Sequence, residues 1–124
     1  MTVAYWCVLA NILMPIAFAG LAKAGAAGFD NRNPRPWLAG LTGWRQRAHA
    51  AQQNSHEAVA PFAAAVIIAH QLGADQGLIN AFALGFMALR VLYGAFYIAD
   101  RDWLRSLAWL GAMGCVVALF VVAA

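Results

Sequence analysis

The feature that most constrains this chain is the length of its uncharged, apolar stretches. No Asp, Glu, Lys or Arg occurs from Met1 to Ala22, and none occurs from Leu107 to Ala124. A helix that crosses a bilayer needs about 20 such residues, because the hydrocarbon core is about 30 Å thick. Only 10% of the 124 residues are charged, whereas a soluble domain carries about a quarter. The sequence therefore predicts an integral membrane protein.

Apolar segments and turn residues divide the chain into helices within a single domain that covers residues 1–124. The predicted fold is an all-α membrane protein, a bundle of four transmembrane helices. The expected helices run from about Val3 to Ala22, Thr42 to Leu72, Asp75 to Ala99 and Trp103 to Ala124. The segment Gly25–Gly40 contains Pro34 and Pro36, which disfavour a continued helix, so it is expected to be a loop.

The basic residues are confined to two regions of the chain. Their two groups are Lys23, Arg32, Arg35, Arg45 and Arg47 after the first apolar segment, and Arg90, Arg101 and Arg105 within or after the third. Loops rich in Lys and Arg are retained on the cytoplasmic side of a membrane. The first and third connections are therefore expected in the cytoplasm and both termini on the other side. No continuous basic, water-facing surface remains, which argues against a nucleic-acid partner and leaves lipid as the surroundings.

Polar residues within the predicted membrane helices are the most informative about function. They form two sets with helical spacing, Arg47, Asn54 and Glu57 in the second predicted helix and Arg90, Tyr93 and Tyr97 in the third. Each set lies on one face of its helix, which can point toward a neighbouring helix. An Arg at the centre of a membrane helix costs about 2.5–3.5 kcal/mol on insertion scales. Glu57 and Arg90 are therefore expected to form a buried ion pair.

Two interpretations of these residues remain open. In the structural one, the Glu57–Arg90 pair locks two helices together and the tyrosines only pack. In the binding one, the arginines at the same cytoplasmic end leave positive charge that Glu57 cannot neutralise, namely Arg47, Arg101 and Arg105. Guanidinium groups bind carboxylates in a bidentate fashion. The same arginines could instead bind lipid phosphates or set the topology. No metal site is predicted, because the histidines do not supply three ligands on one face.

Two motifs in this chain resemble those of a known family. The first comprises Arg47-Ala48-His49, Asn54-Ser55-His56-Glu57 and Pro61-Phe62, and the second comprises Arg90-x-x-Tyr93-x-x-x-Tyr97 followed by Leu104-Arg105-Ser106. Both are similar to the signatures of the MAPEG family, the membrane-associated proteins in eicosanoid and glutathione metabolism. The order of the motifs and the helix placement also agree, and the chain looks most like the small bacterial members.

The resemblance implies a homotrimer, and for a bacterial member we expect the inner membrane. The orientation that the basic residues indicate then makes both termini periplasmic. Its sites would lie between subunits near the cytoplasmic face, each holding glutathione as a co-substrate. By position, the glutathione contacts would be Asn54, Glu57, Arg90, Tyr93 and Tyr97. Arg47, which matches the family less well, and Arg101 are further candidates for binding the same ligand because of their positive charge. Arg105 would be the catalytic residue, because it matches an arginine that is proposed to stabilise the glutathione thiolate.

The predicted function is that of a glutathione-dependent transferase or peroxidase that acts on an apolar, electrophilic small molecule taken from the bilayer. The alternative is a non-catalytic membrane protein of the same fold that binds a ligand or serves as a scaffold. Small multidrug transporters also have four helices in a short chain. Their essential acid lies in the first helix, however, and the first apolar segment here contains no acid.

Overall fold

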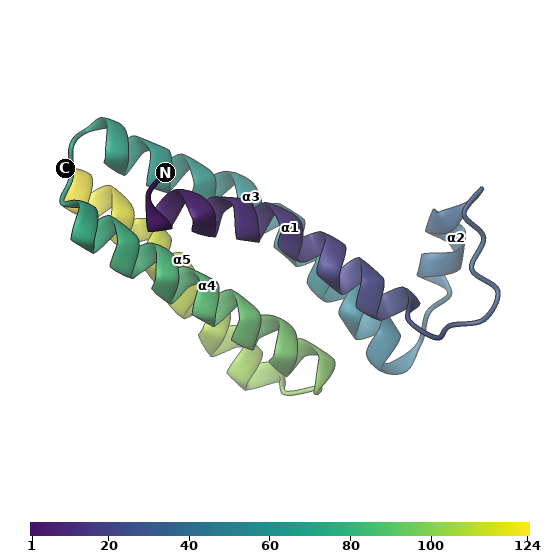
Figure 1. Cartoon of the computed structure of the whole chain (residues 1–124). Coiled ribbons are helices and arrows are strands. Elements are labelled where there is room, and N and C mark those ends of the chain that lie inside the picture. The colour runs from purple at the N-terminus through teal and green to yellow at the C-terminus, as the bar shows by residue number, and fades with distance from the viewer.

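The computed structural model describes all residues from 1 to 124 as four long helices and one short helix (Figure 1). These are α1 (Val3–Lys23), α2 (Pro34–Ala39), α3 (Gly43–Gln71), α4 (Gln76–Ile98) and α5 (Asp102–Ala123). Every predicted end of the four long helices is within one residue of the observed end. Glycine follows the ends of α1 and α3, at Gly25 and Gly73. The connection from α4 to α5 has neither glycine nor proline, and there the charged residues Asp100 and Arg101 interrupt the apolar sequence, with Asp100 at a φ of 60°.

The prediction that residues 25–40 form only a loop is wrong, because α2 lies within this segment. Pro34 occupies the first turn of α2, where a missing backbone N–H costs nothing and a fixed φ favours the helix. The helix ends at Gly40 after six residues. The ring of Trp37 meets the ring of Phe29 edge to face, with 5.0 Å between the centroids. This contact ties α2 to the preceding part of the connection.

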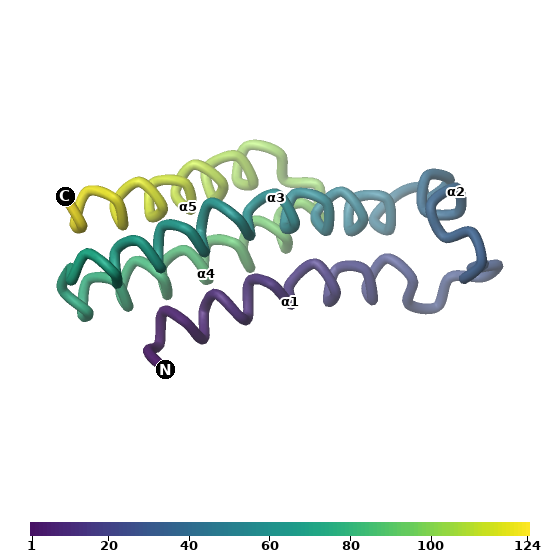
Figure 2. The backbone as a smooth tube through the Cα atoms, turned by 90° about the horizontal axis from the view of Figure 1, so that it is seen from above, coloured from purple at the N-terminus to yellow at the C-terminus, as the bar shows by residue number.

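The central element of the bundle is α3, which contacts each of the other four helices, as no other helix does (Figure 2). The buried positions of α3 share one face and are mostly small, namely Ala48, Ala51, Ser55, Ala58, Phe62, Ala65, Val66 and Ala69. Small side chains allow helix backbones to approach closely inside a membrane. The one large ring on this face, Phe62, stacks on Phe86 of α4 with 3.9 Å between the centroids.

Three helices, α1, α4 and α5, are long and apolar enough to cross a membrane. Together with the low charge of the chain, they support an integral membrane protein. The long helix α3 is not among them, because its first half is polar. Both termini lie at the end of the bundle where α3 turns into α4, and α2 lies toward the opposite end (Figure 1).

Candidate functional site

A buried arginine organises the contact between α3 and α4. Arg90 is 0% exposed. Its Nη1 donates to Oδ1 of Asn54 at 2.9 Å, and its Nη2 donates to Oγ of Ser55 at 3.3 Å. The guanidinium carbon lies 4.4 Å from the centre of the Tyr93 ring, which adds a cation–π contact. The charge is thus surrounded by an amide, a hydroxyl and an aromatic face, while Nε has no hydrogen-bond partner.

The predicted direct ion pair between Glu57 and Arg90 is wrong, because Asn54 lies between them. Its Oδ1 accepts from Arg90, and its Nδ2 donates to Oε2 of Glu57 at 3.1 Å. Glu57 follows Asn54 by three residues on α3 and is exposed on the surface of the single chain. The amide therefore connects the buried cation to an outward-facing carboxylate. We name Arg90, Asn54, Ser55 and Glu57 the Arg90 cluster.

Two tyrosines connect the Arg90 cluster to the end of α4. The rings of Tyr93 and Tyr97 meet edge to face, with centroids 5.7 Å apart and an angle of 78° between the planes. The guanidinium carbon of Arg105, from α5, lies 4.3 Å from the centre of the Tyr97 ring. Arg105 is half-buried. It is therefore held against α4 by an aromatic face.

These side chains line a pocket between α3, α4 and α5. The larger pocket has a volume of about 460 Å³ and is lined by Asn54, Tyr93, Tyr97, Arg105, Ser106, Trp109 and Leu110. A smaller pocket of about 140 Å³ is lined by Asn54, Glu57, Ala58, Pro61, Trp109 and Met113. The two pockets share Asn54 and Trp109, and we name them together the α3–α5 crevice. The volume of the larger pocket lies within the usual range for small-molecule sites, about 300–1,000 Å³.

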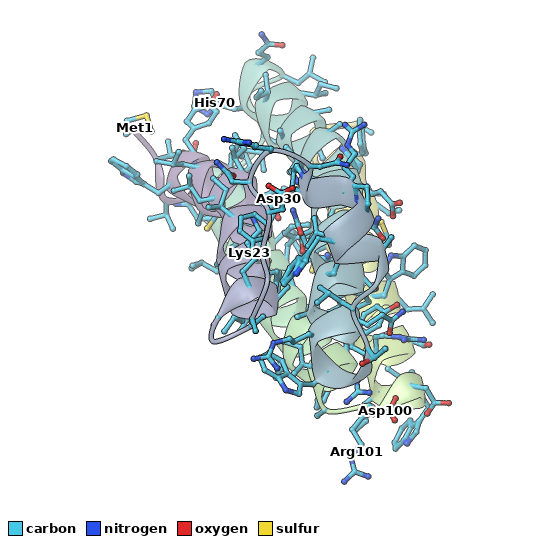
Figure 3. All side chains as sticks on the ribbon, turned by 90° about the vertical axis from the view of Figure 1, so that its right-hand side faces the viewer. Met1, Lys23, Asp30, His70, Asp100 and Arg101 are labelled. Carbon is cyan, nitrogen blue, oxygen red and sulfur yellow. The ribbon has the colours of Figure 1, made fainter.

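Of the four arginines that the sequence suggested as site residues, only Arg105 lines this crevice. Arg90 is fully buried and contacts the lining residues Asn54 and Tyr93, whereas Arg47 and Arg101 lie elsewhere. Nε of Arg47 donates to the backbone carbonyl of Ile98 at 3.1 Å. A cation at this position stabilises the C-terminal end of α4, where the helix dipole is negative. Arg101 is exposed just before α5 and points away from the bundle (Figure 3). The structure thus brings six of the eight candidates together, and leaves Arg47 and Arg101 apart from them.

Sequence reasoning missed two kinds of residue at this site. Ser55 is one, since its hydroxyl accepts from Arg90 while donating to the carbonyl of Ala51 at 2.8 Å. Trp109 and Met113 are the other kind. They follow Arg105 by four and eight residues, so they lie on the same face of α5. Their helical spacing from Arg105 was the signal that could have identified them.

One known protein family is similar to this chain over almost its whole length. The model described as "MAPEG family" matches residues 3–124. No curated protein sequence matches the chain, and no solved structure does. The family match covers both motifs and all the long helices, which is essentially the whole chain. On this basis the chain belongs to the MAPEG family.

Proposed function

We propose that this protein is a glutathione-dependent transferase or peroxidase that acts on apolar electrophiles from the bilayer. The observation that carries the proposal is the charge pattern of the α3–α5 crevice. Arg105 lines the larger pocket, and Glu57 lines the smaller one. Glutathione carries an ammonium group, two carboxylates and a thiol, so its ammonium can pair with the Glu57 carboxylate while its thiolate lies beside the Arg105 guanidinium.

The chemistry that this arrangement supports is stabilisation of a thiolate. A cysteine thiol has a pKa of about 8.5, so only a small fraction is ionised at neutral pH, and the thiolate is the nucleophile. A cation within about 4–6 Å favours the ionised form. Arg105 is suited to that role because a guanidinium stays protonated and cannot act as a base. Its contribution is electrostatic.

The site is completed by further copies of the chain in a homotrimer. Glu57 is exposed in the single chain. Asn54 connects it to Arg90, which belongs to α4, a helix that can span the membrane. Gln53 and His56, next to it on α3, are exposed as well. Such groups are costly against lipid and almost always face protein or a water-filled cavity. A neighbouring copy packed on this face of α3 covers them and closes the crevice.

Native mass spectrometry of the detergent-purified protein, titrated with glutathione, tests the ligand and the assembly together. We expect trimers that bind up to three glutathione molecules, with one site for each subunit. Glutaryl-Cys-Gly, which is glutathione without its ammonium group, should bind more weakly because it cannot pair with Glu57. A trimer that does not bind glutathione at high concentration would favour the non-catalytic alternative. A monomer that binds glutathione fully would contradict a site between subunits.

The orientation follows from the basic connections and from a membrane crossing by α3. All four long helices cross, because α3 packs against α1, α4 and α5, each of which is a candidate span. An even number of crossings places both termini on one side, and the basic connections place that side in the periplasm of a bacterial inner membrane. A periplasm-specific reporter should be active after Ala124 and inactive at Asn33. Activity at Asn33 would reverse the orientation.

A further inference from the structure

We infer that the electrophile of this site is a flat, conjugated molecule and that Trp109 selects it by stacking. The inference rests on the proposed function, because it concerns the second substrate of the same crevice. Trp109 lines both the larger and the smaller pocket, and besides it only Asn54 does so. The indole therefore lies where the two pockets of the crevice meet, one helical turn along α5 from Arg105.

Trp109 differs from the two tyrosines of the larger pocket because its ring contacts no other ring and no cation. Tyr93 packs against the Arg90 guanidinium, and Tyr97 packs against the Arg105 guanidinium. The two tyrosine rings also meet each other edge to face. Trp109 forms neither a ring–ring nor a cation–ring contact in the structure and is 39% exposed. An indole in this position can stack on a flat, π-rich ligand.

The position of the indole also matches where the electrophile must lie. The reacting carbon has to reach the sulfur that Arg105 stabilises, within about 3–3.5 Å. The apolar surfaces of the larger pocket next to Arg105 are Trp109 and Leu110. Leu110 is 59% exposed on the same helix, so the apolar surface of the pocket continues onto the outer surface of α5. An electrophile that enters from the bilayer along α5 therefore reaches Trp109 beside the thiolate.

Conjugate addition to an enone is the reaction that fits this arrangement. The thiolate lone pair forms the S–C bond to the β-carbon, and the C=C electron pair moves toward the carbonyl oxygen to give an enolate. The negative charge thus passes from sulfur to oxygen, and a proton from water then converts the enolate to the ketone. No oxidant or reductant is needed. The Arg105 guanidinium lies one turn from the indole and can stabilise the charge as it moves.

Two enones that differ only in their flat area provide the test. The probes are 4-phenyl-3-buten-2-one, whose ring is conjugated with the enone, and 3-nonen-2-one, which carries an alkyl chain. With glutathione saturating, we expect Trp109→Leu to lower the ratio of kcat/KM for the aryl enone to kcat/KM for the alkyl enone about tenfold, the loss expected for an aromatic stacking contact. Trp109→Phe, which restores an aromatic face, should recover most of that ratio.

The matched control is Trp103→Leu, because Trp103 lies on the same helix, is 63% exposed and lines neither pocket. This variant should keep the wild-type ratio. An unchanged ratio in Trp109→Leu, or equal changes in both tryptophan variants, would overturn the selection by Trp109. A wild-type protein that ionises glutathione but shows no preference for the aryl enone would overturn the inference and leave the proposed function standing. A wild-type protein that neither binds nor ionises glutathione would remove both.

Discussion

Arg105→Ala should keep most of its affinity for glutathione and lose most of its activity. The guanidinium supplies the positive charge that favours the thiolate in the larger pocket, so its removal leaves the bound thiol protonated at neutral pH. The ultraviolet absorbance of the thiolate should disappear at saturating glutathione. We expect kcat with a reactive electrophile to fall about 100-fold or more, as it does when one preorganised electrostatic contact to a developing charge is lost.

The chain contains a matched control for this experiment. Arg101 is four residues before Arg105, is also a guanidinium at the start of α5, and lies outside the crevice. Arg101→Ala should keep the thiolate signal and the turnover of the wild type. If both substitutions reduce turnover equally while the thiolate signal survives, Arg105 anchors the helix at the membrane boundary and has no electrostatic role in the reaction.

Arg90→Ala should be the most destabilising substitution in the Arg90 cluster. It removes two hydrogen bonds from a side chain that is 0% exposed and leaves Asn54 and Ser55 facing a cavity. A buried polar group that is left without its hydrogen-bond partner costs about 1–3 kcal/mol. Equilibrium unfolding in mixed micelles should therefore show a loss of this size in the free energy of unfolding.

Double-mutant cycles then distinguish the relayed arrangement from a direct ion pair. Arg90 bonds to Asn54 directly and reaches Glu57 only through that amide. Residues in direct contact give coupling energies of about 0.5–3 kcal/mol. We expect a coupling in this range for Arg90 with Asn54 and a smaller one for Arg90 with Glu57. A larger coupling with Glu57 would restore the direct pair that the sequence alone suggests.

The sequence by itself determined the helices, the membrane setting and the family. Apolar length defines a membrane helix because the bilayer core has a fixed thickness, and glycine, proline or charged residues interrupt the apolar sequence at the connections. Helical periodicity also placed Asn54 with Glu57 on one helix and Arg90 with Tyr93 on another, which are the residues that meet in the structure. The exception was α2, where a proline begins a helix in place of preventing one.

Only the tertiary structure decided which of the polar residues meet across helices. Periodicity gives the angle between side chains on one helix, but it does not give the rotation of one helix relative to its neighbour. That rotation is set by the packing of the small face of α3, from Ala51 to Ala69, against the adjacent helices. It turns Asn54 toward Arg90 and leaves Glu57 outside. The same packing brings Trp109 beside the site and brings Arg47 within hydrogen-bond distance of the Ile98 carbonyl. Neither contact can be predicted from the sequence of a single helix.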